Sequence, residues 1–317
     1  DENEVRMLEA GGDEYAFQFI RNKISDIEIT PAQLALDPCS ASAVITDVNT
    51  GEVRALVTYP SYDNNKFSGT VDAEYYNKLN NDQSLPLFNN ATQAQKAPGS
   101  TFKPIIAVAA LEEGVIGLND TVNCTGIYKE ITPALRCWIY PGQHGPLDVV
   151  HGIQNSCNVF FSEMGHRLSM DGNGNYSPEL GIEKIRKYAS MFGLDETSGI
   201  EIAEREPQMT TEKPEASSIG QGKNSYSNIQ LSRYITAVAN KGTVFKLSLL
   251  DKMTDSQGNL LKDFTPEVRS TIDVKDSTWN AVHTGMRRVI SDGSARKIFS
   301  DLEVDIAGKT GTAEEIK

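Results

Sequence analysis

The sequence has no long apolar run. Its most apolar stretch, "PIIAVAAL" from Pro104 to Leu111, is far shorter than the ~20 apolar residues that a membrane-spanning helix needs. We therefore expect no such helix in this chain. The sequence begins at Asp1 rather than at a methionine, so we interpret it as a fragment of a longer protein whose signal or anchor lies outside it.

Positive charge is also scarce. The 317 residues include 30 Lys and Arg against 43 Asp and Glu, which gives a formal net charge of −13. Nucleic acid and anionic membrane surfaces would repel such a chain and are excluded as general partners. The hydrophobic content of 39% is enough to fill the core of a globular protein of this length.

Cysteine is rare as well. Four cysteines in a chain of this length cannot form the dense disulfide framework of a small secreted domain. Cys39 stands alone, whereas Cys124, Cys137 and Cys157 lie close together in the sequence with His144. This local concentration of sulfur and imidazole needs an explanation other than a disulfide framework.

Hydrophobic periodicity predicts a mixed architecture. Two β-branched runs on either side of "NTGE" predict a β-hairpin within residues 43–60. Residues 98–114 predict a buried helix, and residues 246–263 predict two strands joined by a turn. A hairpin followed by many helices and a last strand predicts an α+β domain. Helices are also expected near residues 73–79 and at 147–154, 158–170, 181–194, 227–242 and 277–290, and a strand at 304–317.

Ser100 and Lys103 have the spacing that places two side chains on one face of a helix. A serine needs a base to become a good nucleophile, and a lysine in an apolar pocket can have a pKa low enough to serve as that base. The helix N-terminus also favours a developing negative charge. A lone Ser-x-x-Lys is more often a helix cap followed by a surface lysine. Here the preceding "APG" turn and the apolar residues that follow favour the catalytic interpretation.

Two further motifs follow in the chain. Ser156-Cys157-Asn158 puts a hydroxyl and an amide side by side, and Lys309-Thr310-Gly311-Thr312 lies on the expected last strand. A second lysine facing the same cleft would bind a carboxylate and favour the neutral form of the first lysine. Gly311 would leave room for a substrate backbone along the strand.

The three motifs occur in the order S-x-x-K, S-x-N and K-T-G at intervals of about 55 and 150 residues. With "DVNTGEV", "YPSYDNN", "SIGQG" and "AVANKG", they show that the chain resembles the transpeptidase domain of class B penicillin-binding proteins. The resemblance implies the α+β fold of penicillin-binding proteins and serine β-lactamases, an antiparallel sheet flanked by helices. It assigns residues 40–317 to the transpeptidase domain and residues 1–39 to a linker or remnant of the N-terminal pedestal.

The resemblance also implies an activity, peptidoglycan D,D-transpeptidation that β-lactams inhibit. Ser100 would form the acyl-enzyme with Lys103 as base, and Ser156 would pass a proton to the departing D-alanine. Asn158 would bind the donor peptide, and Lys309 and Thr310 would hold its terminal carboxylate, beside Gly311. The backbone N–H groups of Ser100 and Thr312 would form the oxyanion hole.

The same resemblance implies where the protein works and with what. Its partners would be stem peptides, lipid-linked precursors, β-lactams and a membrane glycosyltransferase. It would act on the outer face of the bacterial plasma membrane, anchored by an N-terminal segment. The K-T-G strand of the family pairs with later strands, so we interpret the chain, which ends at Lys317, as truncated after that strand. "SNIQ" at Ser227 replaces the Thr-Pro-Leu-Gln that the family pattern predicts, so no site is assigned there.

The cysteine cluster has three interpretations. Cys124, Cys137, His144 and Cys157 follow the pattern C-x12-C-x6-H-x12-C, and three thiolates with one imidazole suit a closed, structural zinc site. A Cys124–Cys137 disulfide and separate buried thiols are the alternatives. The chain is similar here to a zinc-carrying subgroup of class B penicillin-binding proteins known among clostridia. His151 is expected on a helix face rather than as a ligand.

If the turn at Ser156 is not helical, Ser156 and Asn158 point to one side and Cys157 to the other.

Two other functions remain open. A class A β-lactamase needs a deacylating Glu-x-x-Leu-Asn after Ser-x-Asn, and residues 161–208 contain none. A β-lactam sensor or non-catalytic scaffold would keep the nucleophile but need not cross-link. Stable labelling of Ser100 by penicillin would distinguish a transpeptidase or sensor from a lactamase.

Overall fold

The structure of the chain, a computed structural model, describes residues 2–26, 28–29 and 40–313. Its contacts divide it into one unit of residues 1–43 and 57–91 and a second unit of residues 44–56 and 92–317. No helix in the described ranges is both long and apolar enough to cross a membrane. Cys39 lies outside the described residues.

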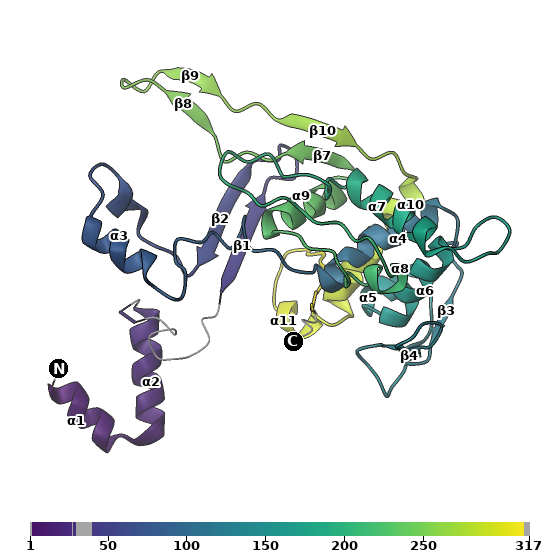
Figure 1. Ribbon diagram of the computed structural model, residues 1–317, viewed down its shortest axis with the longest axis horizontal. Helices are drawn as coiled ribbons and strands as arrows, with labels where there is room; N and C mark the ends of the chain where they lie inside the picture. The colour runs from purple at the N-terminus through teal and green to yellow at the C-terminus, as the bar shows by residue number, and fades with distance from the viewer. Residues whose placement is uncertain (1, 27, 30–39, 314–317) are drawn as a thin grey trace. The chain divides into compact units, whose positions relative to one another are not determined.

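The first unit is built from short helices (Figure 1). The helix expected near residues 73–79 is confirmed as α3, Ala73–Asn80, and the Asp72 side chain caps it by accepting hydrogen bonds from the backbone N–H groups of Glu74 and Tyr75. The remaining helices of this unit are α1, Glu2–Ala10, α2, Gly12–Ser25, and the 3-10 helix η2, Asn64–Phe67.

The predicted β-hairpin is confirmed. Strands β1, Ala41–Thr46, and β2, Val53–Tyr59, pair with each other. The turn between them is closed by hydrogen bonds from Asp47 N to Glu52 O, at 2.8 Å, and from Gly51 N to Asp47 O, at 3.0 Å. Gly51 has a φ of +74°, a conformation that glycine adopts at low cost.

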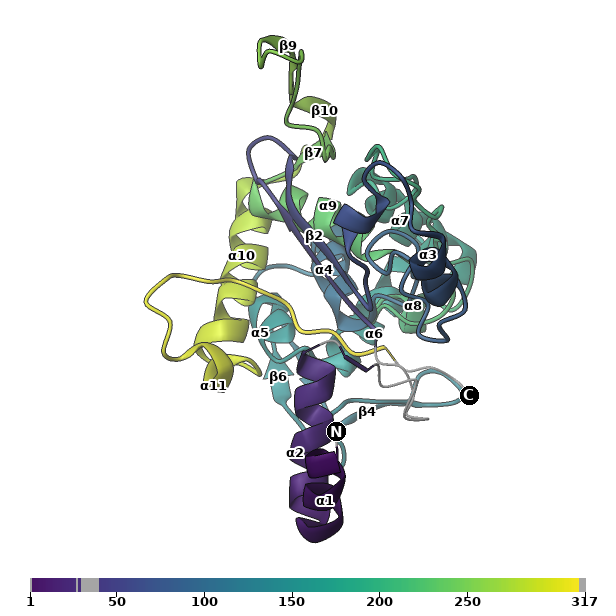
Figure 2. The ribbon, with the colours of Figure 1, turned by 90° about the vertical axis from the view of Figure 1, so that its left-hand side faces the viewer.

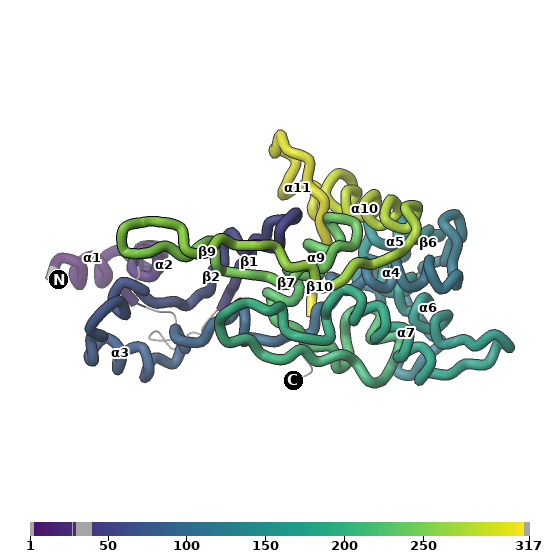
Figure 3. Tube along the Cα trace, turned by 90° about the horizontal axis from the view of Figure 1, so that it is seen from above, coloured from purple at the N-terminus to yellow at the C-terminus, as the bar shows by residue number. Residues whose placement is uncertain are grey.

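A central helix organises the second unit. Helix α4, Lys103–Glu112, is buried at every residue from Lys103 to Leu111, because small and branched apolar side chains cover its whole circumference. Figure 3 shows it between α10 on one side and α6 and α7 on the other, in agreement with their contacts. The bounds of its neighbours are Val149–Gln154 for α5, Asn158–Leu168 for α6, Pro178–Met191 for α7 and Asp276–Ser291 for α10.

The strands of the second unit form separate two-stranded antiparallel ladders in the part of the chain that the structure describes. The strand-turn-strand predicted at 246–263 is confirmed as the β8–β9 hairpin, which projects beyond β7 and β10 (Figures 1 and 2). The pairs are β3, Val122–Cys124, with β6, Gly145–Leu147; β4, Ile127–Tyr128, with β5, Leu135–Arg136; β7, Thr243–Lys246, with β10, Glu267–Thr271; and β8, Lys252–Thr254, with β9, Leu260–Asp263.

The strand expected at the C-terminal end is not found within residues 304–313, and residues 314–317 lie outside the described range. A strand is defined by hydrogen bonds to a neighbouring strand, and this segment bonds to a helix instead, from Gly308 N to Met286 O of α10 at 3.1 Å. The prediction of a K-T-G strand was therefore wrong for the described residues.

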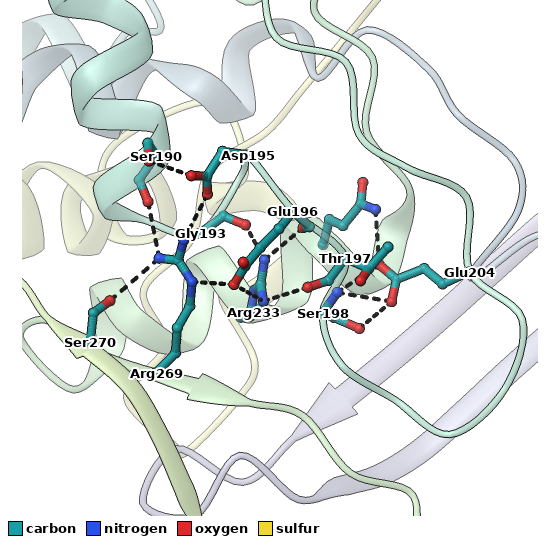
Figure 4. A network of polar contacts seen from close by, with 11 residues as sticks. Ser190, Gly193, Asp195, Glu196, Thr197, Ser198, Glu204, Arg233, Arg269 and Ser270 are labelled. Atoms are coloured by element: carbon teal, nitrogen blue, oxygen red, sulfur yellow. Dashed lines mark hydrogen bonds and ion pairs between the residues drawn. The ribbon is translucent and has the colours of Figure 1, made fainter.

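A buried arginine fixes the loop after α7. Arg233, on α9, Asn228–Ala239, is 2% exposed, and burial lowers its pKa to about 10. Its guanidinium donates to the carbonyl oxygens of Thr197 and Glu196, each at 2.8 Å, and to that of Gly193 (Figure 4). Arg269 of β10 binds Asp195 at 3.0 Å in the same network. The remaining helices of the unit are α8, Pro214–Ser217, and α11, Arg296–Phe299.

Candidate active site

Ser100 lies in a 3-10 turn, η3, Gly99–Phe102, that leads directly into α4. The sequence predicts a helix across this region, and the structure begins it with this tighter turn. Gly99 has a φ of +53°, so the glycine before Ser100 serves a conformation that other residues rarely adopt. The turn presents Ser100 to a cleft while Phe102 beside it is fully buried.

Lys103 is fully buried at the start of α4. Its amine lies 2.7 Å from the backbone oxygen of Ser156, 2.7 Å from Asn158 Oδ1 and 3.3 Å from Ser156 Oγ. Burial, and secondarily the positive charge of Lys309, lowers the pKa of Lys103 to about 7. The Ser-x-x-Lys and Ser-x-Asn motifs are therefore in direct contact through this amine.

The Ser100 hydroxyl is not bonded to the Lys103 amine. Within the residues that the structure describes, the Lys103 amine donates to Ser156 and Asn158, and no partner is recorded for Ser100 Oγ. All three of these contacts of the Lys103 amine are to the Ser-x-Asn motif, two to oxygens of Ser156 and one to Asn158 Oδ1. The helical spacing correctly puts the two residues in one site but does not bring their reactive atoms together.

Ser156 occupies a strained turn between α5 and α6. Its φ of +49° is left-handed, which costs a non-glycine residue about 1–3 kcal/mol. The turn is held by hydrogen bonds from Ser156 N to Ile153 O and from Cys157 N to Gly152 O, each at 3.1 Å. Asn158 is the first residue of α6, and the Cys157 side chain caps that helix.

Lys309 approaches the same hydroxyl from the K-T-G segment. Its amine lies 2.8 Å from Ser156 Oγ and 2.8 Å from the Thr310 backbone oxygen, and burial lowers its pKa to about 8. A Cβ added to Gly311 would lie 2.7 Å from Thr101 Cγ2, so only glycine lets this segment pack against the nucleophile turn. All three motifs therefore meet around Ser156.

Gly220 packs against Gly99, the residue before the nucleophile Ser100. Gly99 N donates to Gly220 O at 3.0 Å, and a Cβ added to Gly220 would lie 1.9 Å from Gly99 O. A Cβ on Gly99 would in turn lie 2.3 Å from Thr312 O. The "SIGQG" turn and the K-T-G segment thus both pack directly on the Ser100 turn.

The motifs open onto a cleft of about 580 Å³. No acidic residue is among the described residues that line it, although the chain has 43 carboxylates. The cleft is lined by Ser100, Ala134, Leu135, Arg136, Trp138, Ser156, Asn158, Ile219, Gln221, Ser294, Thr310, Gly311 and Thr312.

From the sequence, Trp138 and Tyr140 could either line the cleft or lie in the core. Aromatic residues beside a turn are more often in the core, yet Trp138 is 60% exposed and lines the cleft. Its indole N–H donates to Asn155 O at 2.8 Å, and its ring packs edge-on against His144. Tyr140 is also exposed rather than buried. No sequence signal distinguishes these positions from core aromatics, because their exposure depends on how the loop is folded.

The cysteine cluster includes Cys157, the middle residue of the Ser-x-Asn motif. Cys124, Cys137, His144 and Cys157 place their side-chain sulfur or nitrogen atoms within 4.8 Å of one another. The three cysteines are free thiols, so no Cys124–Cys137 disulfide is present. The neighbouring Cys157 thiol lowers the pKa of Cys137, which favours a thiolate in the cluster.

Three distances in this cluster match the spacing of ligand atoms in a tetrahedral metal site. Zinc bonds of about 2.3 Å to sulfur and 2.1 Å to nitrogen place tetrahedral ligand atoms roughly 3.5–3.8 Å apart. His144 Nδ1 lies 3.5 Å from Cys124 Sγ and 3.7 Å from Cys137 Sγ, and the sulfurs of Cys137 and Cys157 are 3.9 Å apart. His151 does not join them, because its ring bonds to Asp148 and Arg288.

Comparison with known proteins defines the class to which this fold and site belong. The family described as "Penicillin binding protein transpeptidase domain" matches residues 41–317. The chain belongs to this family, and the predicted family and α+β penicillin-binding fold are confirmed.

The relatives are more specific. The chain is 32% identical over 293 residues to "Peptidoglycan D,D-transpeptidase MrdA" of Escherichia coli K12, a match that covers 86% of this chain and 44% of that protein. It is similar to a chain of a peptidoglycan synthase complex, with a TM-score of 0.76 and 28% sequence identity. That match covers 86% of this chain and 46% of the other chain. It is also similar to Pseudomonas aeruginosa PBP2 in complex with WCK 5153, with a TM-score of 0.73 and 26% sequence identity. That match covers 86% of this chain and 62% of the PBP2 chain. The chain thus spans less than half the length of the curated relative.

Proposed function

We propose that this chain is the acyl-transferring domain of a peptidoglycan D,D-transpeptidase and that β-lactams acylate and inhibit it. The observation that carries this proposal is the meeting of two lysines with depressed pKa values on one hydroxyl, that of Ser156, beside the cleft that holds Ser100. A nucleophile, a base, a proton relay and a carboxylate-binding cation are then present in one site.

The first half-reaction uses the Ser-x-x-Lys and Ser-x-Asn motifs. Ser100 Oγ attacks the carbonyl carbon between the two D-alanines. Its proton passes to neutral Lys103 once the amine turns from its acceptors on Ser156 and Asn158 toward Ser100 Oγ. The pKa of Lys103, about 7, makes the neutral amine accessible near neutral pH. The peptide C–N bond then breaks, and the leaving D-alanine nitrogen takes a proton through Ser156 Oγ, which lies 3.3 Å from the Lys103 amine.

The K-T-G segment binds the substrate. Protonated Lys309, with Thr310, would hold the terminal carboxylate of the donor, and Gly311 lets the segment pack against the Ser100 turn. Backbone N–H groups of Ser100 and Thr312 would stabilise the oxyanion, an interaction that is worth about 3 kcal/mol per donor in acyl transfer. The amine of a second stem peptide then attacks the acyl carbon and gives a proton to neutral Lys103. The bond from the acyl carbon to Ser100 Oγ breaks, Ser100 Oγ takes that proton from Lys103, and the cross-link is complete.

The test is labelling with fluorescent penicillin, followed by peptide mapping and measurement of label release. We expect the label on Ser100, loss of labelling in Ser100→Ala, and release over many minutes. We also expect the full-length protein to cross-link stem peptides. Release within seconds would instead identify a β-lactamase. Stable labelling without cross-linking would identify a sensor, and no labelling would disprove the proposal.

We also propose that Cys124, Cys137, His144 and Cys157 hold a structural zinc ion, as in the clostridial-type subgroup. The short distances and the free thiols support this assignment. Bound zinc, held by these four side chains, would link β3, the loop after β5 and the Ser156 turn to one another. Cys157 is adjacent to both Ser156 and Asn158, so this cross-link would hold the catalytic turn without taking part in the reaction.

The wider setting is proposed on the same basis. Residues 40–317 would form the catalytic domain, and residues 1–39 would be a linker or a remnant of the N-terminal pedestal. The protein would work at the outer face of the plasma membrane, anchored through its N-terminal side, on stem peptides of lipid-linked precursors. The similarity to a chain of a peptidoglycan synthase complex supports a membrane glycosyltransferase as partner.

A further inference from the structure

Arg136 is a cation of the cleft that the proposed mechanism does not use. It is the last residue of β5, it is exposed, and it lines the cleft together with Ser100 and Asn158. In the part of the chain that the structure describes, no carboxylate partner is recorded for its guanidinium, which lies 4.8 Å from the centre of the Tyr140 ring. Stacking on an aromatic ring orients a guanidinium and leaves its in-plane N–H donors free.

The backbone of Arg136 is fixed relative to the reacting groups. Arg136 pairs with Ile127 across the β4–β5 ladder, and the next residue, Cys137, donates its N–H to Gly126 O at 2.9 Å. Arg136 O accepts a hydrogen bond from Asn158 Nδ2 at 3.1 Å, and Asn158 Oδ1 lies 2.7 Å from the Lys103 amine. The arginine is therefore tied to the catalytic lysine through a single side chain.

The charge around Arg136 is unusual for this protein. The chain carries a net charge of −13, yet no acidic residue is among those described as lining the cleft. A cation without a neighbouring carboxylate attracts an anion from solution more strongly than one that is already neutralised. Lys309 is less available for a second anion. Its amine already contacts Ser156 Oγ and the Thr310 oxygen, and the proposed function assigns it the terminal carboxylate of the donor.

We propose that Arg136 recognises a second carboxylate on the acyl donor, upstream of the bond that Ser100 attacks. This inference rests on the proposed function and specifies its substrate class: donors with an anionic side chain near the reacting peptide bond. The terminal carboxylate is held by the K-T-G segment, and the second carboxylate binds on the Asn158 side. A guanidinium presents two parallel N–H donors that match the two oxygens of a carboxylate.

Carbenicillin and benzylpenicillin test this directly, because they differ by one carboxylate on the side chain. The measurement is the second-order rate constant for acylation of Ser100 by each compound in wild-type protein and in Arg136→Gln. We expect the ratio of carbenicillin to benzylpenicillin to fall about three- to tenfold in Arg136→Gln. Arg136→Lys keeps part of the preference, and Arg136→Glu lowers the ratio further.

A matched control removes a charge elsewhere. Arg205 is also exposed but does not line the cleft, so Arg205→Gln has the same net charge as Arg136→Gln and should leave the ratio unchanged. The wild-type ratio should also decrease as salt rises, since salt screens an exposed charge pair. Arg136→Gln should weaken this salt dependence, whereas a merely structural role of Arg136 would leave it as in the wild type.

The outcomes separate the two proposals. If neither penicillin acylates the protein, the proposed function fails. If both acylate it and Arg136→Gln leaves the ratio unchanged, or slows both compounds equally, the recognition of a second carboxylate is disproved. Equal melting temperatures of the Arg136 and Arg205 variants would show that both are folded.

Discussion

Lys103 and Lys309 share one acceptor: their amines lie 3.3 and 2.8 Å from the same atom, Ser156 Oγ. Two ammonium groups this close repel each other, so the site favours the state in which one lysine is neutral. Lys103, the more buried of the two, has a pKa of about 7, and that of Lys309 is about 8. The arrangement therefore favours a neutral Lys103 beside a charged Lys309.

This pair predicts a bell-shaped pH profile for acylation. Below a pH of about 7 Lys103 gains a proton and cannot accept one from Ser100, so the rate falls as pH decreases. Above a pH of about 8 Lys309 loses the charge that holds the substrate carboxylate, so the rate falls again. The measurement is the second-order acylation rate constant for benzylpenicillin between pH 5 and 10, and its two apparent pKa values belong to the pair.

Lys309→Gln separates the two contributions. Removal of the neighbouring charge raises the pKa of Lys103, so the acidic limb of the profile should move to higher pH and the basic limb should disappear. Lys262→Gln, on the exposed β9 strand, removes one charge outside the cleft and should leave the profile in place. An acidic limb that does not move in Lys309→Gln would contradict the assignment of Lys103 as base.

Gly220→Ala should greatly slow acylation. The added Cβ would lie 1.9 Å from Gly99 O, and the backbone carrying Ser100 must move to relieve this overlap. A misplaced nucleophile costs on the order of 100-fold in rate. Gly174→Ala is the matched control, because its φ of +82° is similar to the +75° of Gly220 but nothing lies within 4 Å of its Cβ. Acylation at the wild-type rate in Gly220→Ala would show that the contact does not position Ser100.

The sequence predicted those parts of the fold that local patterns determine. Alternation of β-branched residues around a turn gave the β1–β2 hairpin, and the apolar run after Lys103 gave the buried helix α4. The alternation of Ser156, Cys157 and Asn158 also anticipated the geometry. Ser156 Oγ and Asn158 Oδ1 contact Lys103, and Cys157 Sγ lies 3.9 Å from Cys137 Sγ.

Features that depend on distant parts of the chain were not predictable in this way. The K-T-G segment has the composition of a strand, but a strand also needs a neighbouring strand, and Gly308 bonds to α10 instead. The spacing of Ser100 and Lys103 could not show that the amine bonds to the Ser156 turn. The contact of Gly220 with Gly99 joins residues that are far apart in sequence, and no local pattern encodes it.

Cys157→Ser tests the proposed zinc site. Serine keeps the N-terminal cap of α6, which the Cys157 side chain provides by accepting from Phe160 N at 3.4 Å, but removes the thiolate. We expect about one zinc per wild-type chain, loss of zinc in Cys157→Ser, and a melting temperature lower by roughly 10 °C. Metal analysis by emission spectroscopy and thermal melts with and without a chelator measure both effects.

Two variants control for nonspecific effects of this change. Cys39→Ser changes the one cysteine outside the cluster pattern, and His151→Gln changes a histidine that bonds to Asp148 and Arg288. Both should retain the metal. Zinc-free wild-type protein whose melting temperature is unaffected by chelator would rule out the site, as would a Cys124–Cys137 disulfide in the purified protein.

Arg233→Met should destabilise the protein without removing any cleft residue. Arg233 is 2% exposed and donates to three backbone carbonyls, which methionine leaves without donors inside the protein. Loss of such buried partners costs about 3 kcal/mol of unfolding free energy or more.

Arg54→Gln is the control, since Arg54 is 54% exposed and its pairs with Asp47 and Glu52 lie at the surface. Such pairs contribute about 1 kcal/mol or less. Urea denaturation gives both values, and a loss in Arg233→Met no larger than that in Arg54→Gln would show that the buried arginine is not the support of the loop after α7.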